Sequence, residues 1–227
     1  MSQPIRFPRP DGREAMGSLA LPASSSAASV VLLHEWWGLT GTVERLADRL
    51  AAAGYRVLAL DYYRGFVATS KLEAMRQRMS LDLMEVVTQD VRGAVQYLKA
   101  SGGRVAVLGF SLGGAVAMTA ACHLPELAAA VCFYGLPPAR FADPGRIPIP
   151  LQAHFALTDE WYSPAVIDAL ETRLREGRVT HEFYRYAARH GFFSSHWPEE
   201  YDAATAEQAW ERLLAFLAAQ LGPGAPR

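Results

Sequence analysis

The sequence predicts an α/β fold in which a mostly parallel central sheet is flanked by helices on both faces. Short apolar runs rich in Val, Leu and Ala alternate with longer segments whose apolar residues recur at helical spacing. This alternation is typical of parallel strands joined by right-handed helical crossovers. The chain has 227 residues, 51% of them hydrophobic and 20% charged, and we expect one globular domain over residues 1–227.

The first half of the chain contains the clearest pattern of a buried strand. Val30–Leu33 is apolar at every position, as expected for a strand whose two faces are both covered. Val43, Leu46 and Leu50 share one helical face, and Gly54 follows as a helix end. The expected elements are an edge strand over residues 13–21, a loop over 22–29, a strand over 30–33, a helix over 42–53, a strand over 55–60 and an irregular, partly helical segment over 64–85.

In the second half, strands and helices alternate almost to the end of the sequence. Val91, Val95 and Leu98 form the apolar face of one helix. Ser163–Pro164 has the residue types of a helix N-cap and first turn, and Asp202 is a candidate N-cap for the last helix. The expected elements are helices over residues 89–100, 115–121, 163–176 and from 202 onward, strands over 104–108, 127–134, 151–156 and 180–186, a loop over 135–150 and a tail over 222–227.

The segment Gly109–Gly114, with the sequence Gly-Phe-Ser-Leu-Gly-Gly, lies between a predicted strand and a predicted helix. In this context G-x-S-x-G indicates a nucleophile elbow, a sharp turn in which bulky neighbours of the serine would clash. Ser111 is therefore the expected nucleophile, and a glycine-rich turn without chemistry is the alternative. We expect the N–H groups of Leu112 and Trp36 to bind the negative oxygen formed during acyl transfer.

Residues able to assist Ser111 follow other predicted strands. In open α/β sheets, active-site residues gather beyond the carboxyl ends of the strands. Asp159, His190 and Glu35 each follow such a strand. The chain order Ser, Asp, His is that of the α/β-hydrolases. A serine hydroxyl needs a base such as imidazole to take its proton, and an acid that holds the tautomer of the imidazole.

Each of these assignments has a competing one. His196 is the second candidate for the base, and Glu160 is the second candidate for the acid. His190 is preferred because it lies in a His-Gly-Phe segment of a loop, and Asp159 because it comes first after its strand. For Glu35 the alternative is a solvated loop carboxylate, but its apolar neighbours favour burial near the site.

Composition and charge argue against several classes of function. The formal net charge is −1, so we expect no basic face for nucleic acid. The N-terminus lacks the apolar segment of a secretory signal, and no apolar run reaches about 18 residues, so we expect no membrane span and, by default, a cytoplasmic location. Cys122 and Cys132 are expected to be buried thiols, and the six histidines show no metal-ligand spacing.

Four segments of the chain resemble the dienelactone hydrolases, also called carboxymethylenebutenolidases. The likeness extends over roughly residues 5–220. It implies an α/β-hydrolase fold and hydrolysis of a small lactone or ester without metal or organic cofactor. The segments that carry it are His34–Leu39 (His-Glu-Trp-Trp-Gly-Leu), Gly109–Ala115, His154–Pro164 and His190–Phe192.

The same resemblance implies a role for Glu35, whose counterpart in the resting enzyme partners the nucleophile and helps to activate it when substrate binds. The chain departs from the family in two places. The usual nucleophile is cysteine, whereas this chain has Ser111; either His190 acts as in conventional serine hydrolases, or the serine is a replacement for cysteine that traps substrate. Four residues after His190, where lactonases of the family can carry an arginine for the substrate carboxylate, this chain has Ser194.

Several residues are candidates for contacting the substrate. Arg76 and Arg78 are candidates for binding an anionic group, and a solvated helix face is the alternative. Aromatic residues near the expected site are candidates for an apolar pocket wall, and burial in the interior is the alternative. They are Trp36, Trp37, Tyr62, Phe192 and Trp197.

The expected function is hydrolysis of a small carboxylic ester or lactone through an acyl-enzyme on Ser111, with His190 and Asp159. The alternatives are acyl transfer or thioester cleavage on the same residues, and non-catalytic binding of a small molecule on a hydrolase scaffold. The expected partner is the small-molecule substrate, and the expected assembly is a monomer or a small homo-oligomer.

Overall fold

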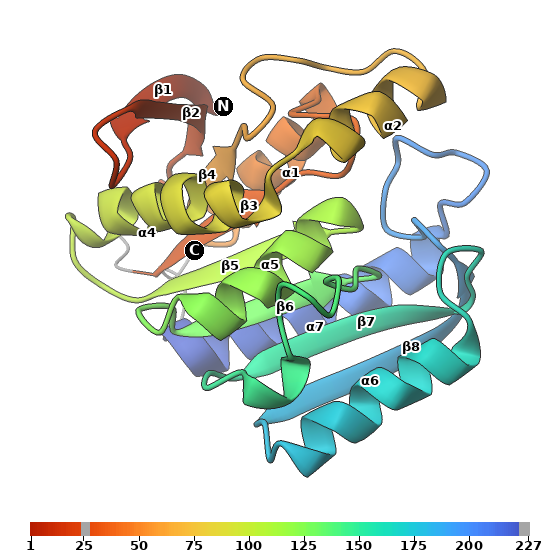
Figure 1. Ribbon diagram of the computed structural model, residues 1–227. Coiled ribbons are helices and arrows are strands. Elements are labelled where there is room, and N and C mark those ends of the chain that lie inside the picture. Colours follow the sequence, from red (N-terminus) through yellow and green to blue (C-terminus); the bar gives the residue numbers. More distant parts are fainter. Residues whose placement is uncertain (24–27, 223–227) are drawn as a thin grey trace.

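The computed structural model describes residues 1–23 and 28–222, and its strands form an eight-stranded sheet. The strands are β1 (Gln3–Pro8), β2 (Glu14–Ala20), β3 (Ser29–Leu33), β4 (Arg56–Leu60), β5 (Val105–Phe110), β6 (Ala129–Phe133), β7 (Leu151–Thr158) and β8 (His181–Arg189). They lie in the order β1-β2-β4-β3-β5-β6-β7-β8. The pairs β1–β2 and β2–β4 are antiparallel, and the others are parallel (Figure 1). The predicted α/β-hydrolase sheet is therefore confirmed.

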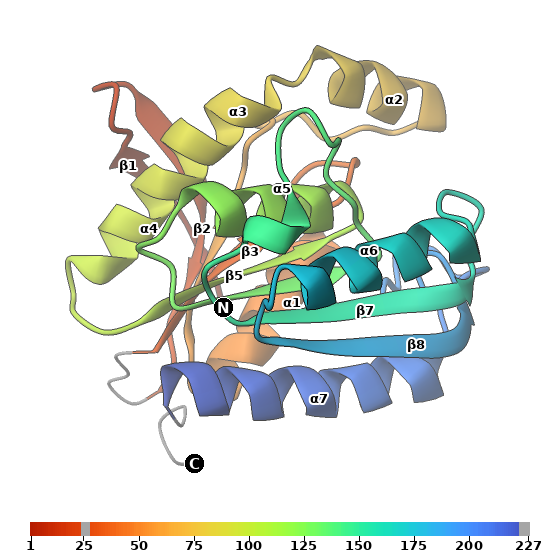
Figure 2. The same ribbon diagram turned by 60° about the horizontal axis from the view of Figure 1, so that its bottom comes forward.

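Helices cover both faces of this sheet. The helices are α1 (Gly41–Ala52), α2 (Lys71–Ser80), α3 (Leu83–Glu85), α4 (Arg92–Lys99), α5 (Leu112–His123), α6 (Pro164–Glu176) and α7 (Ala203–Leu221), with a π-helix over Val86–Val91 and a 3-10 helix over Pro144–Arg146. In Figure 2, α4, α5 and α6 lie on one side of the sheet and α1 and α7 on the other. Among the described residues, no helix has the length and apolar character needed to cross a bilayer.

The two helical layers explain why β3 is apolar at every position. Val31 and Leu33 point into the core under α4 and α5, whereas Val30 and Leu32 point into the core under α1 and α7. Successive residues of a strand face opposite sides of the sheet, so a strand covered on both sides needs an apolar residue at each position.

The N-terminal strand is a feature that the sequence did not predict. The segment 13–21 was expected to be the edge strand; β2 occupies this segment, but β1 lies outside it, so the prediction is wrong about the edge. Pro4 and Pro8 obscure the pattern of β1, and an edge strand tolerates proline because some of its N–H groups have no partner strand. Residues 24–27 of the expected loop and 223–227 of the expected tail lie outside the described residues.

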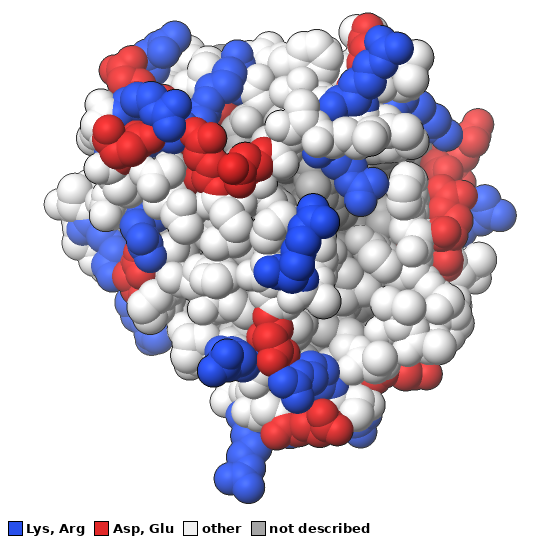
Figure 3. All heavy atoms as spheres, viewed as in Figure 1, with Lys and Arg blue, Asp and Glu red and all other residues white. Residues whose placement is uncertain are grey.

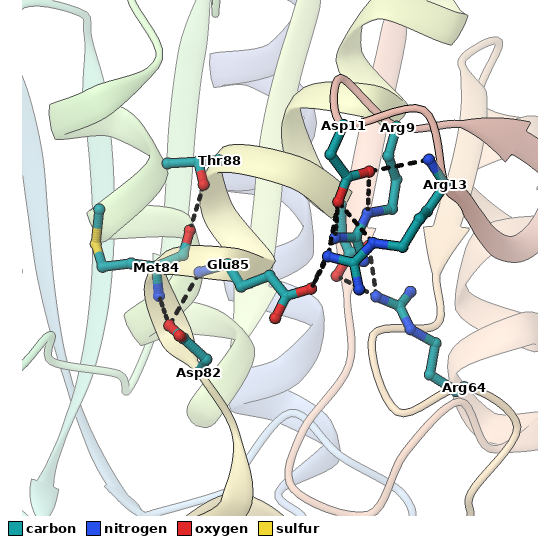
Figure 4. A network of polar contacts seen from close by, with 9 residues as sticks. Arg9, Asp11, Arg13, Arg64, Asp82, Met84, Glu85 and Thr88 are labelled. Atoms are coloured by element: carbon teal, nitrogen blue, oxygen red, sulfur yellow. Dashed lines mark hydrogen bonds and ion pairs between the residues drawn. The ribbon is translucent and has the colours of Figure 1, made fainter.

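An ion-pair network centred on the buried Arg9 and Asp90 joins the β1–β2 hairpin to the helical segment that begins with α3 (Figure 4). The side chain of Arg9 is 2% exposed and contacts Asp11 at 2.6 Å, Glu85 at 2.7 Å and Asp90 at 3.2 Å. Asp90 lies in the π-helix, and its two oxygens also accept hydrogen bonds from Arg64 at 2.9 Å. The predicted helix 89–100 therefore starts earlier, because α3, the π-helix and α4 are continuous from residue 83.

We expect Arg9→Ala to lower the free energy of unfolding by about 2–4 kcal/mol, because it leaves the buried Asp90 carboxylate with Arg64 as its remaining cation. Arg6→Ala is the matched control, since Arg6 forms an exposed pair with Glu14 and its loss should cost less than about 0.5 kcal/mol. Urea denaturation measures both variants. Equal, small effects would show that the network does not stabilise the fold.

Candidate active site

Ser111 stands at the turn between β5 and α5 with a positive φ of 51°, a conformation that residues other than glycine adopt rarely. The glycines on either side are required by close backbone contacts. An added Cβ at Gly109 would collide with the backbone of Gly113, and one at Gly113 would collide with the carbonyl oxygens of Leu33 and His34. The turn therefore has the sharp geometry expected from the motif.

Gly113→Ala is expected to lower the free energy of unfolding by about 3 kcal/mol or more, because both clashing atoms belong to the backbone and cannot move aside. Gly41→Ala is the control. Its added Cβ would lie 3.5 Å from the Arg45 side chain, an ordinary contact at the start of α1. Thermal and urea unfolding of both variants test this, and a stable Gly113→Ala protein would disprove the close approach.

Three of the predicted side chains form a hydrogen-bonded row. The Oγ of Ser111 lies 3.0 Å from Nε2 of His190, and Nδ1 of His190 lies 2.8 Å from Oδ2 of Asp159. The other oxygen of Asp159 accepts hydrogen bonds from the N–H groups of Trp161 at 2.7 Å and Tyr162 at 3.2 Å. The side chain of Asp159 is completely buried, and that of His190 is 14% exposed. The imidazole of His190 is thus held by Asp159 on one side and remains partly exposed on the other.

The competing candidates lie elsewhere. The ring of His196 packs against that of Trp37 at 5.3 Å and does not contact Ser111. Glu160 is exposed at the rim of the cavity, and among the described residues it forms no hydrogen bond with His190. The structure therefore brings the first choices for base and acid together and leaves out the second choices.

Glu35 is buried, with 8% of its surface exposed, and its hydrogen bonds go to residues other than Ser111. Its Oε1 accepts a hydrogen bond from the Tyr134 hydroxyl at 3.4 Å, and its Oε2 accepts one from the Ser194 hydroxyl at 3.1 Å. Burial raises the pKa of Glu35, although the Ser194 hydrogen bond and the nearby His190 oppose this rise. The expected contact between Glu35 and the nucleophile is wrong for this state, because hydroxyl donors engage both carboxylate oxygens.

Tyr134 is a residue of the site that sequence reasoning missed. Its side chain is completely buried, its φ is +38°, and its ring lies 4.9 Å from that of His190. It therefore contacts both Glu35 and the ring of His190. Its position directly after β6 is the signal that could have revealed it, since the other site residues also follow strands.

A cavity of about 510 Å³ opens onto Ser111. Both expected oxyanion residues, Leu112 and Trp36, line it. Leu112 is the first residue of α5, and the first N–H groups of a helix have no acceptor within the helix. The face in Figure 3 is hollowed to the right of centre, and Lys and Arg side chains lie beside the hollow. The cations that line the cavity are Lys71, Arg78 and Arg140.

Several predicted substrate contacts do not line this cavity. Phe192 is completely buried between the rings of Tyr134 and Tyr186, so it belongs to the core. Trp37 is 7% exposed and lines a separate, smaller cavity instead. Tyr62 is buried in a stack with His34, and Arg76 is exposed on α2, so neither lines the cavity. The predicted contacts that do line it are Arg78, Trp36 and Trp197.

The two cysteine thiols form hydrogen bonds with backbone carbonyl groups and not with Ser111. Burial raises the pKa of the Cys132 thiol to about 12 and that of Cys122 to about 11, so both thiols are protonated at neutral pH. Cys132 is buried as expected, and Cys122 is half-buried. Within residues 1–23 and 28–222, no group of three or more His, Cys, Asp or Glu side chains is arranged to hold a metal ion.

Comparison with known proteins shows the family of this chain. The sequence pattern of the dienelactone hydrolase family matches residues 16–221. The chain belongs to the dienelactone hydrolase family. As a member, it is a hydrolase of carboxylic esters or lactones, as the resemblance in its motifs implied.

The alignments with similar proteins cover most of the chain. Protein usf of Aquifex pyrophilus is 30% identical over 227 residues, which cover 95% of this chain and 97% of that protein. Carboxymethylenebutenolidase 1 of Cupriavidus pinatubonensis is 28% identical over 212 residues, covering 88% and 89%. Among solved structures, a dienelactone hydrolase-like promiscuous phosphotriesterase from metagenomic libraries has a TM-score of 0.83 at 22% identity, covering 97% and 99%.

Proposed function

We propose that the chain hydrolyses a small carboxylic ester or lactone through an acyl-enzyme on Ser111. The hydrogen-bonded row from Ser111 through His190 to Asp159 carries this proposal. Its distances of 3.0 and 2.8 Å lie in the range that general acid–base catalysis requires. Among the two interpretations of Ser111, this row favours a conventional serine hydrolase, because the base is already in contact with the hydroxyl.

The first half of the reaction forms the acyl-enzyme. Asp159 accepts the hydrogen on Nδ1 of His190, so the lone pair on Nε2 takes the hydroxyl proton while Oγ of Ser111 bonds to the carbonyl carbon. The N–H groups of Leu112 and Trp36 stabilise the negative oxygen that results. His190 then gives its proton to the leaving oxygen as the ester bond breaks. From a lactone, the new hydroxyl stays attached to the acyl group.

The second half of the reaction releases the acid. His190 takes a proton from water as the water oxygen bonds to the acyl carbon, and the tetrahedral intermediate collapses when that proton returns to Oγ of Ser111. Asp159 stabilises the imidazolium in both halves. It stays in place because its second oxygen is held by two backbone N–H groups.

We further propose that Arg78 contacts an anionic group of the substrate. Its guanidinium lies 5.8 Å from the centre of the Trp161 ring, and that ring lies 6.1 Å from the ring of His190. A carboxylate beside Arg78 would therefore sit within one small molecule's length of the reacting atoms.

Arg78→Ala is expected to raise KM about tenfold for esters that carry a free carboxylate, which is the effect of losing one charged hydrogen bond. The KM for neutral esters of the same size should change little. Arg76→Ala is the matched control, since this arginine is two residues away on α2 and does not line the cavity. Equal effects on charged and neutral esters would contradict the assignment.

A fluorophosphonate probe followed by peptide mass spectrometry tests the proposed function. We expect a covalent adduct on Ser111, with a matching loss of turnover of short p-nitrophenyl esters and of dienelactone. No adduct and no turnover by a folded protein would favour the non-catalytic binder. Product analysis in the presence of an alcohol or thiol acceptor adds a third outcome. If more of the acylated acceptor than of the free acid is formed, the reaction is acyl transfer and not hydrolysis.

A further inference from the structure

Glu35 lies between two cavities. It lines the cavity that opens onto Ser111, and it also lines a second cavity of about 190 Å³ that is bordered by Ser194, Phe110 and the first residues of α1. Ser111 borders only the larger of these cavities, and Ser194 borders only the smaller. The Glu35 carboxylate therefore borders the space in front of each serine.

The contacts of the structure hold the carboxylate near Ser194. The Ser194 hydroxyl donates to Oε2 of Glu35 at 3.1 Å, and the buried Tyr134 hydroxyl donates to Oε1 at 3.4 Å. The backbone of Ser194 is itself fixed, since its N–H donates to the carbonyl of Gly191 at 2.8 Å and its carbonyl accepts from the N–H of Trp197 at 3.1 Å. The loop that carries His190 therefore also carries the residue that binds Glu35.

If the Glu35 carboxylate turned toward Ser111, the hydroxyl of Ser111 would face two hydrogen-bond acceptors, the carboxylate and the imidazole of His190. The hydrogen of Ser111 Oγ is shared with Nε2 of His190 at 3.0 Å. A carboxylate that turned toward Ser111 would compete with the imidazole for this hydrogen. The hydroxyl has one hydrogen to donate, so a hydrogen bond to the carboxylate would break the one to Nε2 of His190. Activation of a serine is therefore better served when Glu35 is kept away from it.

We propose that Ser194 is a positioning residue that holds Glu35 away from Ser111 and so leaves the serine hydroxyl to His190. The inference rests on the proposed function, in which Ser111 is the nucleophile. The chain departs from its family at Ser194, where an arginine can occur, and at Ser111, where cysteine is usual. The proposal assigns a role to Ser194 and links it to the serine nucleophile.

A titration that needs no turnover tests this role. Ser111→Cys supplies a thiol whose ionisation is followed by the ultraviolet absorbance of the thiolate. Adding Ser194→Ala should raise the pKa of that thiol by about one unit, because the negative charge of the released carboxylate comes within reach of the sulfur and disfavours the thiolate. The shift should vanish when Glu35→Gln is also present. Ser195→Ala is the matched control, since this exposed neighbour has no contact with Glu35.

The outcomes of the titration separate the proposal from its alternatives. A rise that depends on Glu35 supports it. No shift, a fall, or a rise that persists with Glu35→Gln overturns it. In the Ser111 protein, Ser194→Ala should also lower kcat/KM for a small ester about tenfold, whereas Ser194→Thr, which keeps the hydroxyl, should retain most of the activity. If the unmodified protein hydrolyses no ester, the proposed function fails, and the titration still decides the role of Ser194.

Discussion

Ser111→Ala is expected to lower kcat for ester hydrolysis by about 10⁶-fold, the scale on which loss of the nucleophile acts in serine hydrolases. The variant removes the oxygen that lies 3.0 Å from Nε2 of His190 and leaves the base without a proton to take. Steady-state assays with a short p-nitrophenyl ester measure the effect. The fold should be retained, because alanine is smaller than serine and the side chain forms no helix-capping hydrogen bond.

Ser195→Ala is the control for this experiment, since Ser195 is exposed and lines only the smaller cavity. It should keep nearly full activity. A decrease of less than about a hundredfold in Ser111→Ala would mean that hydrolysis does not proceed through a serine acyl-enzyme, because removal of a covalent nucleophile costs far more than that.

Asp159→Asn is expected to lower kcat by about 10⁴-fold while leaving the geometry of the site intact. The asparagine can still accept the hydrogen bonds that Asp159 receives from the N–H groups of Trp161 and Tyr162. Its amide would, however, donate to Nδ1 of His190 and force the imidazole proton onto Nε2. That tautomer cannot accept the proton of Ser111, so the row of hydrogen bonds remains but runs in the wrong direction.

Glu160→Gln is the matched comparison, since Glu160 is the neighbouring carboxylate and the competing candidate for the acid. It is exposed and shares no hydrogen bond with His190. We expect kcat to fall by less than about threefold, because an exposed charge is screened by solvent. A large decrease in Glu160→Gln together with an active Asp159→Asn would reverse the assignment of the acid.

Secondary structure was predictable wherever the information is local. The helix from Pro164 and the cap at Asp202 were found because their signals lie within a few neighbouring residues, and Asp202 does accept a hydrogen bond from the N–H of Thr205. The edge of the sheet was not predictable in this way. Whether β2 or β1 forms the edge depends on which strands pair in the folded sheet. The prolines of β1 also interrupt the alternating pattern by which a strand could be predicted there.

The positions of Ser111, Asp159 and His190 were also accessible to sequence reasoning. Each follows a strand, and the carboxyl ends of parallel strands meet at one edge of the sheet. No such rule predicts in which direction the side chain of a loop residue points. Phe192 is only two residues from His190, yet it is completely buried in the core.

The sequence by itself determined which residues are candidates for the chemistry and the order in which they occur, because a nucleophile elbow and its partners are encoded by short motifs and their place after strands. Only the tertiary structure decided which of these residues are partners. Glu35 is paired with Ser194 and Tyr134 rather than with Ser111. That choice is made between groups far apart in the chain, and it depends on which donors packing brings within hydrogen-bond distance of a buried carboxylate.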